Sequence, residues 1–548
     1  MTASSKKSPK PVIASEATQS PAMGMETATS QKHAPRRITA TRVILACLLI
    51  LGAILRLIDL TDPPLDFHST RQLRNILVAR GIYYQLLPDA DPQLRDLAVS
   101  FSNRVGQYEP PIIESLVALG YAWTGGENFA IPRILNTFFW LLAGLALFDF
   151  ARRVTSDEAA LISLAFYLIL PFSVQASRSF QPDPLMTSLF IGGLYFLYRW
   201  MEENDALSLR SCFAAEEISK TVGEAASPKD ARSDKNKWKW ALLAGLLLGF
   251  ATLVKIVIAF FVGAAAVAAV LSVYGWKRFW KSPQVWAMTA LMVIPALSFY
   301  VIGTPGRSTE YFLSWTVDLL KLLGSTKFYL RWMVFLDSLF GLPVIYASLF
   351  GALLMPPRGR ALTLSLWIGY LLYGLTLPFQ MYTHSYYHLQ LVPVIALGIA
   401  PIAKLVIEQA ARQGRFWRMA LIGLILVGVA YPAWTARSVL ISENFRHEPA
   451  FWENIAEAIP AESKTIALTQ DYGYRLMVFG WRKVSLWPLS TELAKVRGGG
   501  IDAQNEFEGL TEGKDYFLIA PCACPTGRPH RSCREHAGAR RQGYAPTF

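Results

Sequence analysis

Charged residues are scarce in this chain of 548 residues. Only 17% of them are Asp, Glu, Lys or Arg, whereas a soluble globular protein normally carries about 25%. Hydrophobic residues make up 53% of the sequence, and the mean hydropathy is +0.29. This composition excludes an ordinary water-soluble protein and favours one that spans a membrane.

Cysteine is sparse, and no cleavable signal is visible. Of the five cysteines, Cys47 and Cys212 stand alone and the other three crowd the C-terminal end, so no disulfide framework is expected. Residues 1–42 are polar, lack the apolar stretch of a secretory signal, and predict a disordered cytoplasmic tail.

The net charge of +13 would suit a nucleic-acid partner, but the Lys and Arg residues lie in short loops between apolar runs. No basic stripe of a nucleic-acid module is visible, so we expect no such partner.

Long apolar runs are abundant. A helix needs about 20 apolar residues to cross the hydrocarbon core of a bilayer. Runs of this kind predict an all-α polytopic membrane protein of about eleven transmembrane helices over residues 43–435. They lie near 43–60, 131–150, 158–177, 184–200, 238–254, 256–274, 285–303, 336–355, 361–379, 386–405 and 418–435.

The positive charges of the short loops define an orientation. They gather on one side of the predicted bundle, which predicts a cytoplasmic N-terminus. The loop 61–130 and the segment after 436 then face outward, most simply from a bacterial inner membrane. Apolar residues recur at helical spacing in 71–87 and 112–123 of this first outer loop, which predicts amphipathic helices in the membrane interface.

Residues 436–548 have the composition of a soluble domain. The stretches KTIALTQ and KDYFLIA resemble strands, and FWENIAEAIP and DYGYRLMVFG resemble helices. Their alternation predicts a small extracytoplasmic α/β domain.

Ionisable side chains at a membrane boundary are costly and therefore suggest function. The motif PPLDFHSTRQ carries Asp66, His68 and Arg71 directly after the first span. Alternatively, Asp66 or Ser69 simply caps the following helix. In QYEPPIIESL, Glu109 precedes two prolines.

Three further motifs lie beyond this loop. In QPDPLM, Asp183 is either a functional carboxylate or a helix cap, and in LVKIV, Lys255 either marks a turn or binds an anion. In YTHSYYHLQLVP, His384 and His388 have a metal-ligand spacing, but with Tyr386 and Tyr387 they would equally suit interface anchoring.

The predicted topology places all five motifs on the outer side, as one active site requires. Arg331 lies in a further outer segment, 304–335, which could form a lid or an interfacial helix.

These motifs, in this order, resemble those of the C-class glycosyltransferase superfamily. The resemblance spans residues 43–405 and is nearest to the branch of protein O-mannosyltransferases and bacterial aminoarabinose transferases of lipid A. It implies sugar transfer from a polyprenyl-phosphate donor to a lipid, glycan or protein acceptor at the extracytoplasmic face.

The resemblance also implies roles for single residues. Asp66 occupies the position of the catalytic base, Glu109 that of a metal or substrate ligand, and Lys255 that of a lysine suited to the lipid phosphate. Asp183 matches the acid of the turn between the third and fourth spans. The chain departs from the family in having Phe67 in place of a second acid, and in lacking a Lys between Glu109 and Pro110.

The chemistry of transfer from a phosphate needs a base, cations and a dry cavity. Asp66 would supply the base, while Lys255, Arg331 and Arg178 could neutralise the leaving phosphate. We expect His68, Arg71, Glu109, Asp183, His384, Tyr387 and His388 to line the substrate site. A divalent metal ion, held in part by Glu109, could assist. A transporter or flippase of lipid-linked sugars is the alternative function, although no internal repeat of the kind common in transporters is visible.

Overall fold

The structure is a computed structural model that describes residues 30–106, 108–218, 228–303, 316–460, 462–487 and 508–519. The chain divides into a short unit, Met1–Ala46, and a large unit, Cys47–Phe548. The large unit contains the helical bundle and the candidate site, so the description below concerns that unit except where α1 begins.

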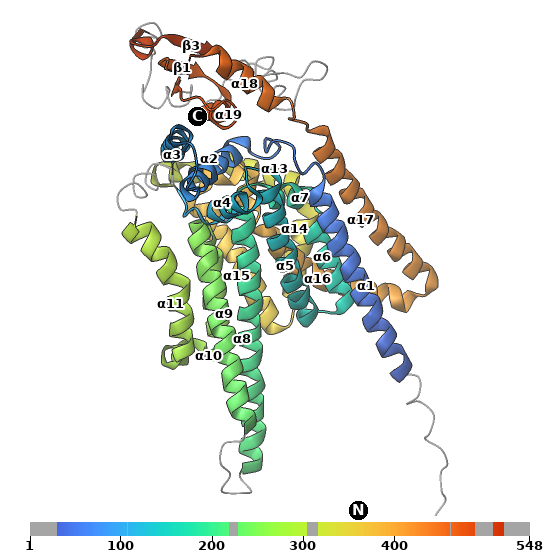
Figure 1. Cartoon of the computed structure of the whole chain (residues 1–548). Coiled ribbons are helices and arrows are strands. Elements are labelled where there is room, and N and C mark those ends of the chain that lie inside the picture. Colours follow the sequence, from blue (N-terminus) through green and yellow to red (C-terminus); the bar gives the residue numbers. More distant parts are fainter. Residues whose placement is uncertain are drawn as a thin grey trace, which may run out of the picture. The chain divides into compact units, whose positions relative to one another are not determined.

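Most of the chain is helical (Figure 1). The first helix, α1 (Ser30–Leu57), begins inside the segment that the sequence assigned to a disordered tail. Residues such as Gln, Lys, Ala and Arg favour helix, and extending a formed helix costs little. The other long helices are α5 (Ala130–Val154), α6 (Asp157–Ile169), α7 (Pro171–Arg178), α8 (Pro182–Ile218), α9 (Pro228–Val254), α10 (Ala259–Arg278), α11 (Pro283–Leu297), α13 (Thr326–Phe340), α14 (Leu342–Leu353), α15 (Pro357–Thr376), α16 (Leu391–Gln413) and α17 (Arg415–Ser442).

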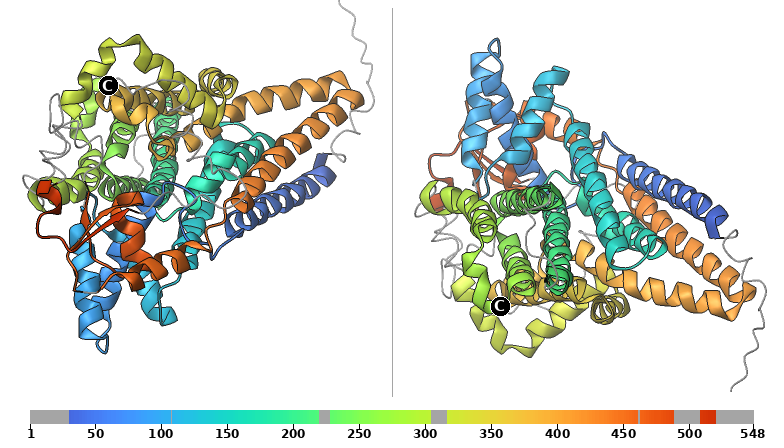
Figure 2. Two further views of the ribbon diagram at one scale, coloured as in Figure 1. Left: turned by 90° about the horizontal axis from the view of Figure 1, so that it is seen from above. Right: turned by 90° about the horizontal axis from the view of Figure 1, so that it is seen from below.

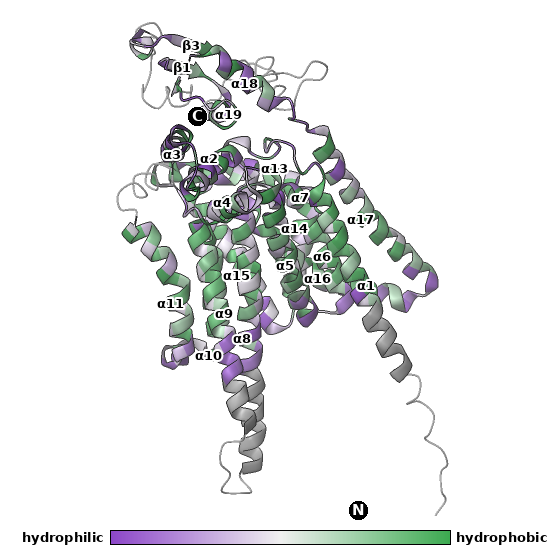
Figure 3. Ribbon diagram, viewed as in Figure 1, coloured by the Kyte–Doolittle hydropathy of each residue, from purple (hydrophilic) through white to green (hydrophobic). Residues whose placement is uncertain are grey.

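Apolar residues dominate the middle of these helices, and polar residues gather toward their ends (Figure 3). Within the described residues, seven helices are long and apolar enough to cross a membrane, or up to nine if the bent pairs α6–α7 and α13–α14 each form one span. The remaining two predicted spans lie in α8 and α15, which are long but carry more polar residues. The count of eleven therefore stays a prediction.

Close packing of neighbouring helices forms the bundle. The green helices α8 and α9 lie side by side, and α9 also packs on α11 (Figures 1 and 2). Helices α14 and α16 approach so closely that a Cβ atom on Gly351 would lie 1.9 Å from the carbonyl oxygen of Gly398. Only glycine fits such a contact between backbones.

Residues 61–130, predicted to be the first outer loop and called by that name below, contain the two predicted helices and one that was not predicted. These are α2 (Ser69–Leu86), α4 (Ile112–Thr124) and, between them, α3 (Pro92–Arg104). The expectation that α2 lies with one face in the membrane interface does not fit its burial, because eleven of its 18 residues are buried, including Arg74 and Arg80. Helices α3, α4 and α19 (Tyr474–Phe479) cover it.

The C-terminal segment contains the four expected elements and one more strand. Helices α18 (Glu448–Ala458) and α19 pack together, and a parallel sheet has the strand order β2 (Ser485–Leu486), β1 (Thr465–Leu468), β3 (Tyr516–Ile519). In its register, Ala467 lies opposite both Leu486 and Leu518. The Cys-rich tail lies outside the described residues.

Candidate active site

Asp66 lies in the turn that leads into α2. Its Oδ1 accepts a hydrogen bond from Gln72 Nε2 at 3.1 Å and lies 3.4 Å from Arg133 Nη2 of α5. The N-cap residue of α2 is His68, with no side-chain cap hydrogen bond. Asp66 and Ser69 therefore do not cap α2 in the way that the alternative interpretation required.

Arg133 is the principal electrostatic partner of Asp66. Its Nη1 donates to the backbone carbonyls of Asp59, Leu60 and Asp62 at 2.6 to 3.1 Å, so the guanidinium is anchored against the end of α1. Burial by itself raises the pKa of the Asp66 carboxyl, but Arg133, Arg178 and the Gln72 hydrogen bond outweigh that effect and hold the pKa below its usual range. Asp66 is thus a carboxylate at neutral pH.

Arg133 was not predicted as a site residue. A signal for it was present, because an arginine inside an otherwise apolar run of a membrane helix is unusual. Arg178 of α7 lies nearby and donates from Nη2 to the carbonyl of Asp59 at 3.1 Å. Each arginine is only 1% exposed, and each has buried N–H groups without a hydrogen-bond partner.

Lys255 and Asp183 form a buried ion pair. Lys255 sits at the break between α9 and the 3-10 helix η1 (Ile256–Ile258), and its Nζ donates to both carboxylate oxygens of Asp183 at 2.8 and 2.9 Å. Asp183 lies in the first turn of α8. Its carboxylate is therefore engaged by a distant cation, which argues against the cap interpretation.

Tyr386 brings together side chains from separate parts of the chain. Its ring centre lies 4.8 Å from that of His68, 4.9 Å from Lys255 Nζ and 5.3 Å from the Arg71 guanidinium carbon. Tyr387 follows it, with its ring centre 5.3 Å from Lys255 Nζ. Both tyrosines offer ring faces to cations, an attractive arrangement.

Arg71 also faces Glu109. Its Nη2 lies 3.4 Å from Glu109 Oε1, while Glu109 Oε2 is buried without a hydrogen-bond partner. Burial raises the pKa of Glu109, but Arg71, Lys255 and Arg74 lower it further than burial raises it, so the group is ionised.

Two imidazoles complete this group. The ring centres of His68 and His384 lie 5.4 Å apart, and His68 Nε2 is 2.9 Å from Ser385 Oγ. Burial lowers the pKa of His68 to about 3, with His384, Arg71 and Lys255 acting in the same direction. Burial, Arg71 and Lys255 lower that of His384 to about 4. Both rings are neutral at physiological pH and can exchange hydrogen bonds with hydroxyl groups.

The structure separates two predicted residues from this group. His388 is fully buried at the end of the 3-10 helix η6 (Ser385–His388), and protein groups engage both its ring nitrogens, Tyr370 OH at 2.9 Å and the Met381 carbonyl at 3.1 Å. His384 and His388 therefore do not share one face of an α-helix, the arrangement that would make their spacing suit a metal, because residues 385–388 form a 3-10 helix and His384 precedes it. Arg331 is exposed on α13 and lies over the ring of Tyr382 at 5.6 Å.

Metal-binding side chains do not cluster at this site. Within the described ranges, no three His, Cys, Asp or Glu side chains lie close enough together to hold one ion. Glu109, the predicted ligand, is paired with Arg71 instead. Metal assistance stays a prediction.

The outcome is two adjoining groups. The first group is the Asp66 carboxylate with Arg133 and Gln72, which hold it in place. The second group surrounds Tyr386 and begins with His68 and Arg71, which follow Asp66 closely in the sequence. Its other members are Glu109, Asp183, Lys255, His384 and Tyr387. The first can accept a proton from a hydroxyl, and the second holds cations that can stabilise a developing negative charge.

A family model matches part of the sequence, and solved structures match most of the length of the chain. Residues 108–215 match the family described as dolichyl-phosphate-mannose-protein mannosyltransferase. This stretch includes Glu109 and Asp183, whereas Asp66 and Lys255 lie outside it. No curated protein matches the chain by sequence.

Among solved structures, the archaeal oligosaccharyltransferase AglB from Archaeoglobus fulgidus, in complex with an inhibitory peptide and a dolichol-phosphate, is 12% identical with a TM-score of 0.51. The match covers 82% of this chain and 65% of that one. ArnT from Cupriavidus metallidurans, bound to undecaprenyl phosphate, is 14% identical with a TM-score of 0.50, and the match covers 83% of this chain and 88% of that one.

Apo ArnT from the same organism is 13% identical with a TM-score of 0.50, over 89% of this chain and 94% of that one. AglB and ArnT are both C-class glycosyltransferases. The chain therefore has the fold of the C-class glycosyltransferases, the superfamily that its outer-loop motifs indicated.

Proposed function

We propose that the chain is a membrane glycosyltransferase that moves a sugar from a polyprenyl-phosphate donor to a lipid, glycan or protein acceptor on the extracytoplasmic face of a bacterial inner membrane. The observation that carries the proposal is the convergence on Tyr386 of His68, Arg71 and Lys255, which come from two segments far apart in the sequence. Independent structural caps would have no reason to meet.

The donor phosphate would lie against Arg71 and Lys255. Both cations face the same tyrosine ring, and each is already balanced by one carboxylate, Glu109 or Asp183. A phosphate that approaches them therefore meets cations held in fixed positions, so little reorganisation accompanies the departure of the leaving group.

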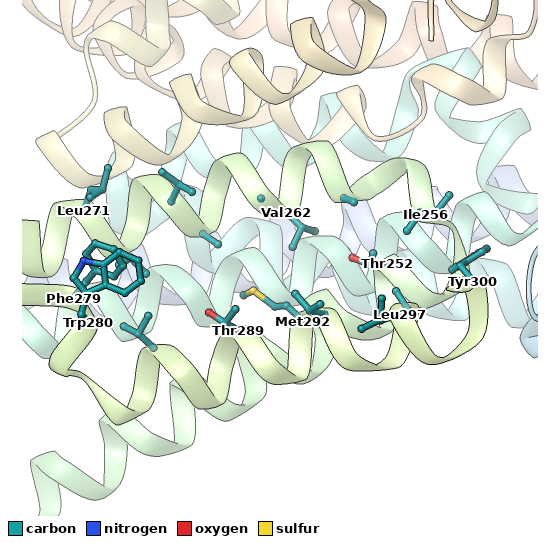
Figure 4. Close-up of a pocket in the computed structure, with 18 of the residues that line it drawn as sticks. Thr252, Ile256, Val262, Leu271, Phe279, Trp280, Thr289, Met292, Leu297 and Tyr300 are labelled. Atoms are coloured by element: carbon teal, nitrogen blue, oxygen red, sulfur yellow. The ribbon is translucent and has the colours of Figure 1, made fainter. Parts of the chain in front are cut away.

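An apolar cavity of about 660 Å³ near the break between α9 and α10 suits the polyprenyl chain. It runs between α9, α10 and α11, and Ile256, the residue after Lys255, is part of its lining (Figure 4). Thr252 and Tyr300 lie at the same end, and Trp280 and Phe279 at the other (Figure 4). A lipid tail in this cavity would place its phosphate near the cations.

Asp66 would act as the base. As the acceptor hydroxyl oxygen attacks the anomeric carbon, its proton passes to the Asp66 carboxylate, the bond from the anomeric carbon to the phosphate oxygen breaks, and polyprenyl phosphate leaves. A positioned base contributes roughly 10²–10⁴ in rate. His68 and His384, both neutral, would bind sugar hydroxyls.

The test uses membranes that contain the full chain and a panel of radiolabelled polyprenyl-phosphate sugars. We expect the wild type to move label from one of these donors to a new molecule, and Asp66→Asn to lose this transfer at equal protein level. Asp91→Asn is the matched control, because Asp91 is an exposed cap of α3 in the same loop.

Full transfer by Asp66→Asn would remove Asp66 from the mechanism. If label crosses the bilayer of proteoliposomes without changing its carrier, the chain is a transporter, the function that the family model and the three structures above do not favour.

A further inference from the structure

A carboxylate of the C-terminal segment reaches the start of α2. Asp471 Oδ1 accepts hydrogen bonds from Ser69 Oγ at 2.7 Å and from Thr70 Oγ1 at 2.6 Å. Ser69 and Thr70 are the first two residues of α2, whose N-cap residue, His68, makes no side-chain cap hydrogen bond. Asp471, 402 positions away from Ser69 in the sequence, thus holds side-chain hydroxyls of the first turn and not its backbone N–H groups. This contact is called the α2 cap below.

Asp471 is held firmly on its own side. Its Oδ2 accepts from Arg475 Nε at 2.6 Å, and Arg475 Nη1 lies 2.9 Å from Glu448 Oε1. Glu448 in turn accepts from Trp452 Nε1 at 2.8 Å. These charge-assisted contacts within the C-terminal segment hold the Asp471 carboxylate in position independently of its contacts with α2.

The backbone at this junction is strained. Within the part of the chain that the structure describes, five residues other than glycine have a positive φ, and they are Asp59, His68, Asp471, Tyr472 and Trp481. His68 belongs to the first outer loop, Asp471, Tyr472 and Trp481 belong to the C-terminal segment, and Asp59 lies in the turn between α1 and the loop. Strained residues persist only where their surroundings hold them, and they concentrate at functional sites.

Position and charge both suit a cap. The N-terminal end of a helix carries unpaired N–H groups and a partial positive charge, which a carboxylate stabilises. Ser69 and Thr70 also lie directly between His68 and Arg71, two side chains of the candidate site. The hydroxyls that Asp471 holds therefore fix the turn that carries both of them.

We infer that Asp471 is a positioning residue of the active site, which caps α2 from the C-terminal segment and sets the pose of His68 and Arg71. The importance of that pose for substrate binding rests on the proposed function. The α2 cap itself does not, so the two can be tested separately.

The experiment uses the full chain in lipid nanodiscs, with undecaprenyl phosphate as the probe. Hydrogen–deuterium exchange reports the amides of residues 68–74, and titration gives the Kd of the probe. We expect Asp471→Ala to speed exchange in this peptide. It should raise the Kd by about tenfold if the binding-competent pose of Arg71 falls to about a tenth of its population.

Two further variants distinguish the loss of the Asp471 contact from a general loosening of the C-terminal segment. Asp515 accepts from the backbone N–H of Lys464 within the same segment, away from α2, so Asp515→Ala should change neither reading. The double variant Ser69→Ala/Thr70→Ala removes both hydroxyl donors and leaves the Asp471–Arg475 pair intact, so it should speed exchange as Asp471→Ala does. Exchange as slow as that of the wild type in this double variant would overturn the hydrogen-bonded cap.

The remaining outcomes are also decisive. Unchanged exchange in Asp471→Ala overturns the cap, and faster exchange with an unchanged Kd overturns the positioning role. If the wild type fails to bind undecaprenyl phosphate, the proposed function fails, while the exchange data still decide whether Asp471 caps α2.

Discussion

Lys255 and Asp183, 72 residues apart, neutralise each other where almost no water reaches them, since their side chains are 4% and 3% exposed. Burying two charges is favourable only when each remains paired, and the loss of one partner leaves the other charge stranded. The same lysine faces Tyr386 and Tyr387. One residue therefore serves both the stability of the bundle and the proposed phosphate site.

We expect Lys255→Met to destabilise the protein by about 3–5 kcal/mol, because Asp183 becomes an unpaired buried carboxylate. The double variant Lys255→Met/Asp183→Leu should lose much less than the sum of the single variants. Denaturant unfolding of the four proteins in detergent gives the coupling energy. Purely additive losses would show that the pair contributes no mutual stabilisation.

Arg133→Met should shift the acidic limb of the pH–rate profile to higher pH. Arg133 helps to hold the pKa of Asp66 below its usual range against the opposing effect of burial. Without this charge, the pKa of Asp66 rises and the base becomes protonated at a higher pH. The measurement is kcat/KM for transfer as a function of pH.

Arg152→Met is the control for that shift, since Arg152 is a half-exposed residue in the last turn of α5, paired with Asp149. Its profile should coincide with that of the wild type. An Arg133→Met profile that falls in height without moving along the pH axis would separate Arg133 from the ionisation of Asp66.

The burial of His68 in its neutral form should make the folded protein less stable at acidic pH. Its pKa in the folded chain is about 3, mainly through burial, whereas an unfolded histidine titrates near 6.5. Below about pH 6.5 the unfolded state therefore takes up a proton that the folded state does not. By linkage, this difference costs up to about 2 kcal/mol at pH 5.

The melting temperature of the wild type should thus fall between about pH 7 and pH 5, and that of His68→Gln should fall less. His447, a half-exposed histidine of the C-terminal segment, provides the comparison, and His447→Gln should retain the full dependence. Equal dependence in both variants would assign the acid lability to other groups.

Arg80→Met should weaken the attachment of the C-terminal segment to α2. Arg80 donates to the carbonyls of Met477 and Val478 at 3.0 and 2.8 Å, pairs with Glu127, and lies 4.1 Å from the ring centre of Trp481. Losing these buried charge-assisted contacts should cost about 2 kcal/mol or more. Limited proteolysis should then cut the segment after α17 sooner.

Arg446→Met tests the specificity of this effect. Arg446 also joins the C-terminal segment to the N-terminal part of the chain, through Asp59 in the turn after α1, but the Arg446 side chain is 59% exposed. Exposed pairs contribute about 0–1 kcal/mol, so the cleavage rate should hardly change. Equal sensitivity of both variants would mean that Arg80 has no special role.

Gly398→Ala should destabilise the bundle by about 1–3 kcal/mol through overpacking. A Cβ at this position would lie 2.2 Å from Ser348 Oγ and 2.3 Å from the Ser348 carbonyl oxygen of α14. Gly423→Ala on α17 meets no atom within 4 Å and should be tolerated. Thermal unfolding in detergent compares the two.

The sequence by itself determined the general class of the protein and most of its helices. Hydrocarbon demands long apolar helices, and such runs are visible without any knowledge of contacts. It also indicated Asp66, Lys255, Asp183, Glu109 and the 384–387 segment, because charged and polar groups at a membrane boundary are conspicuous.

Only the tertiary structure decided which of these residues meet. Two histidines of the same sequence motif lie in different surroundings, because His384 lies beside His68 whereas His388 lies beside Tyr370. Arg133 and Asp471 became partners of the first outer loop through contacts that no local pattern encodes, the second across 402 residues. Helical periodicity and hydropathy act over a few residues, while burial and pairing depend on the packing of the whole chain.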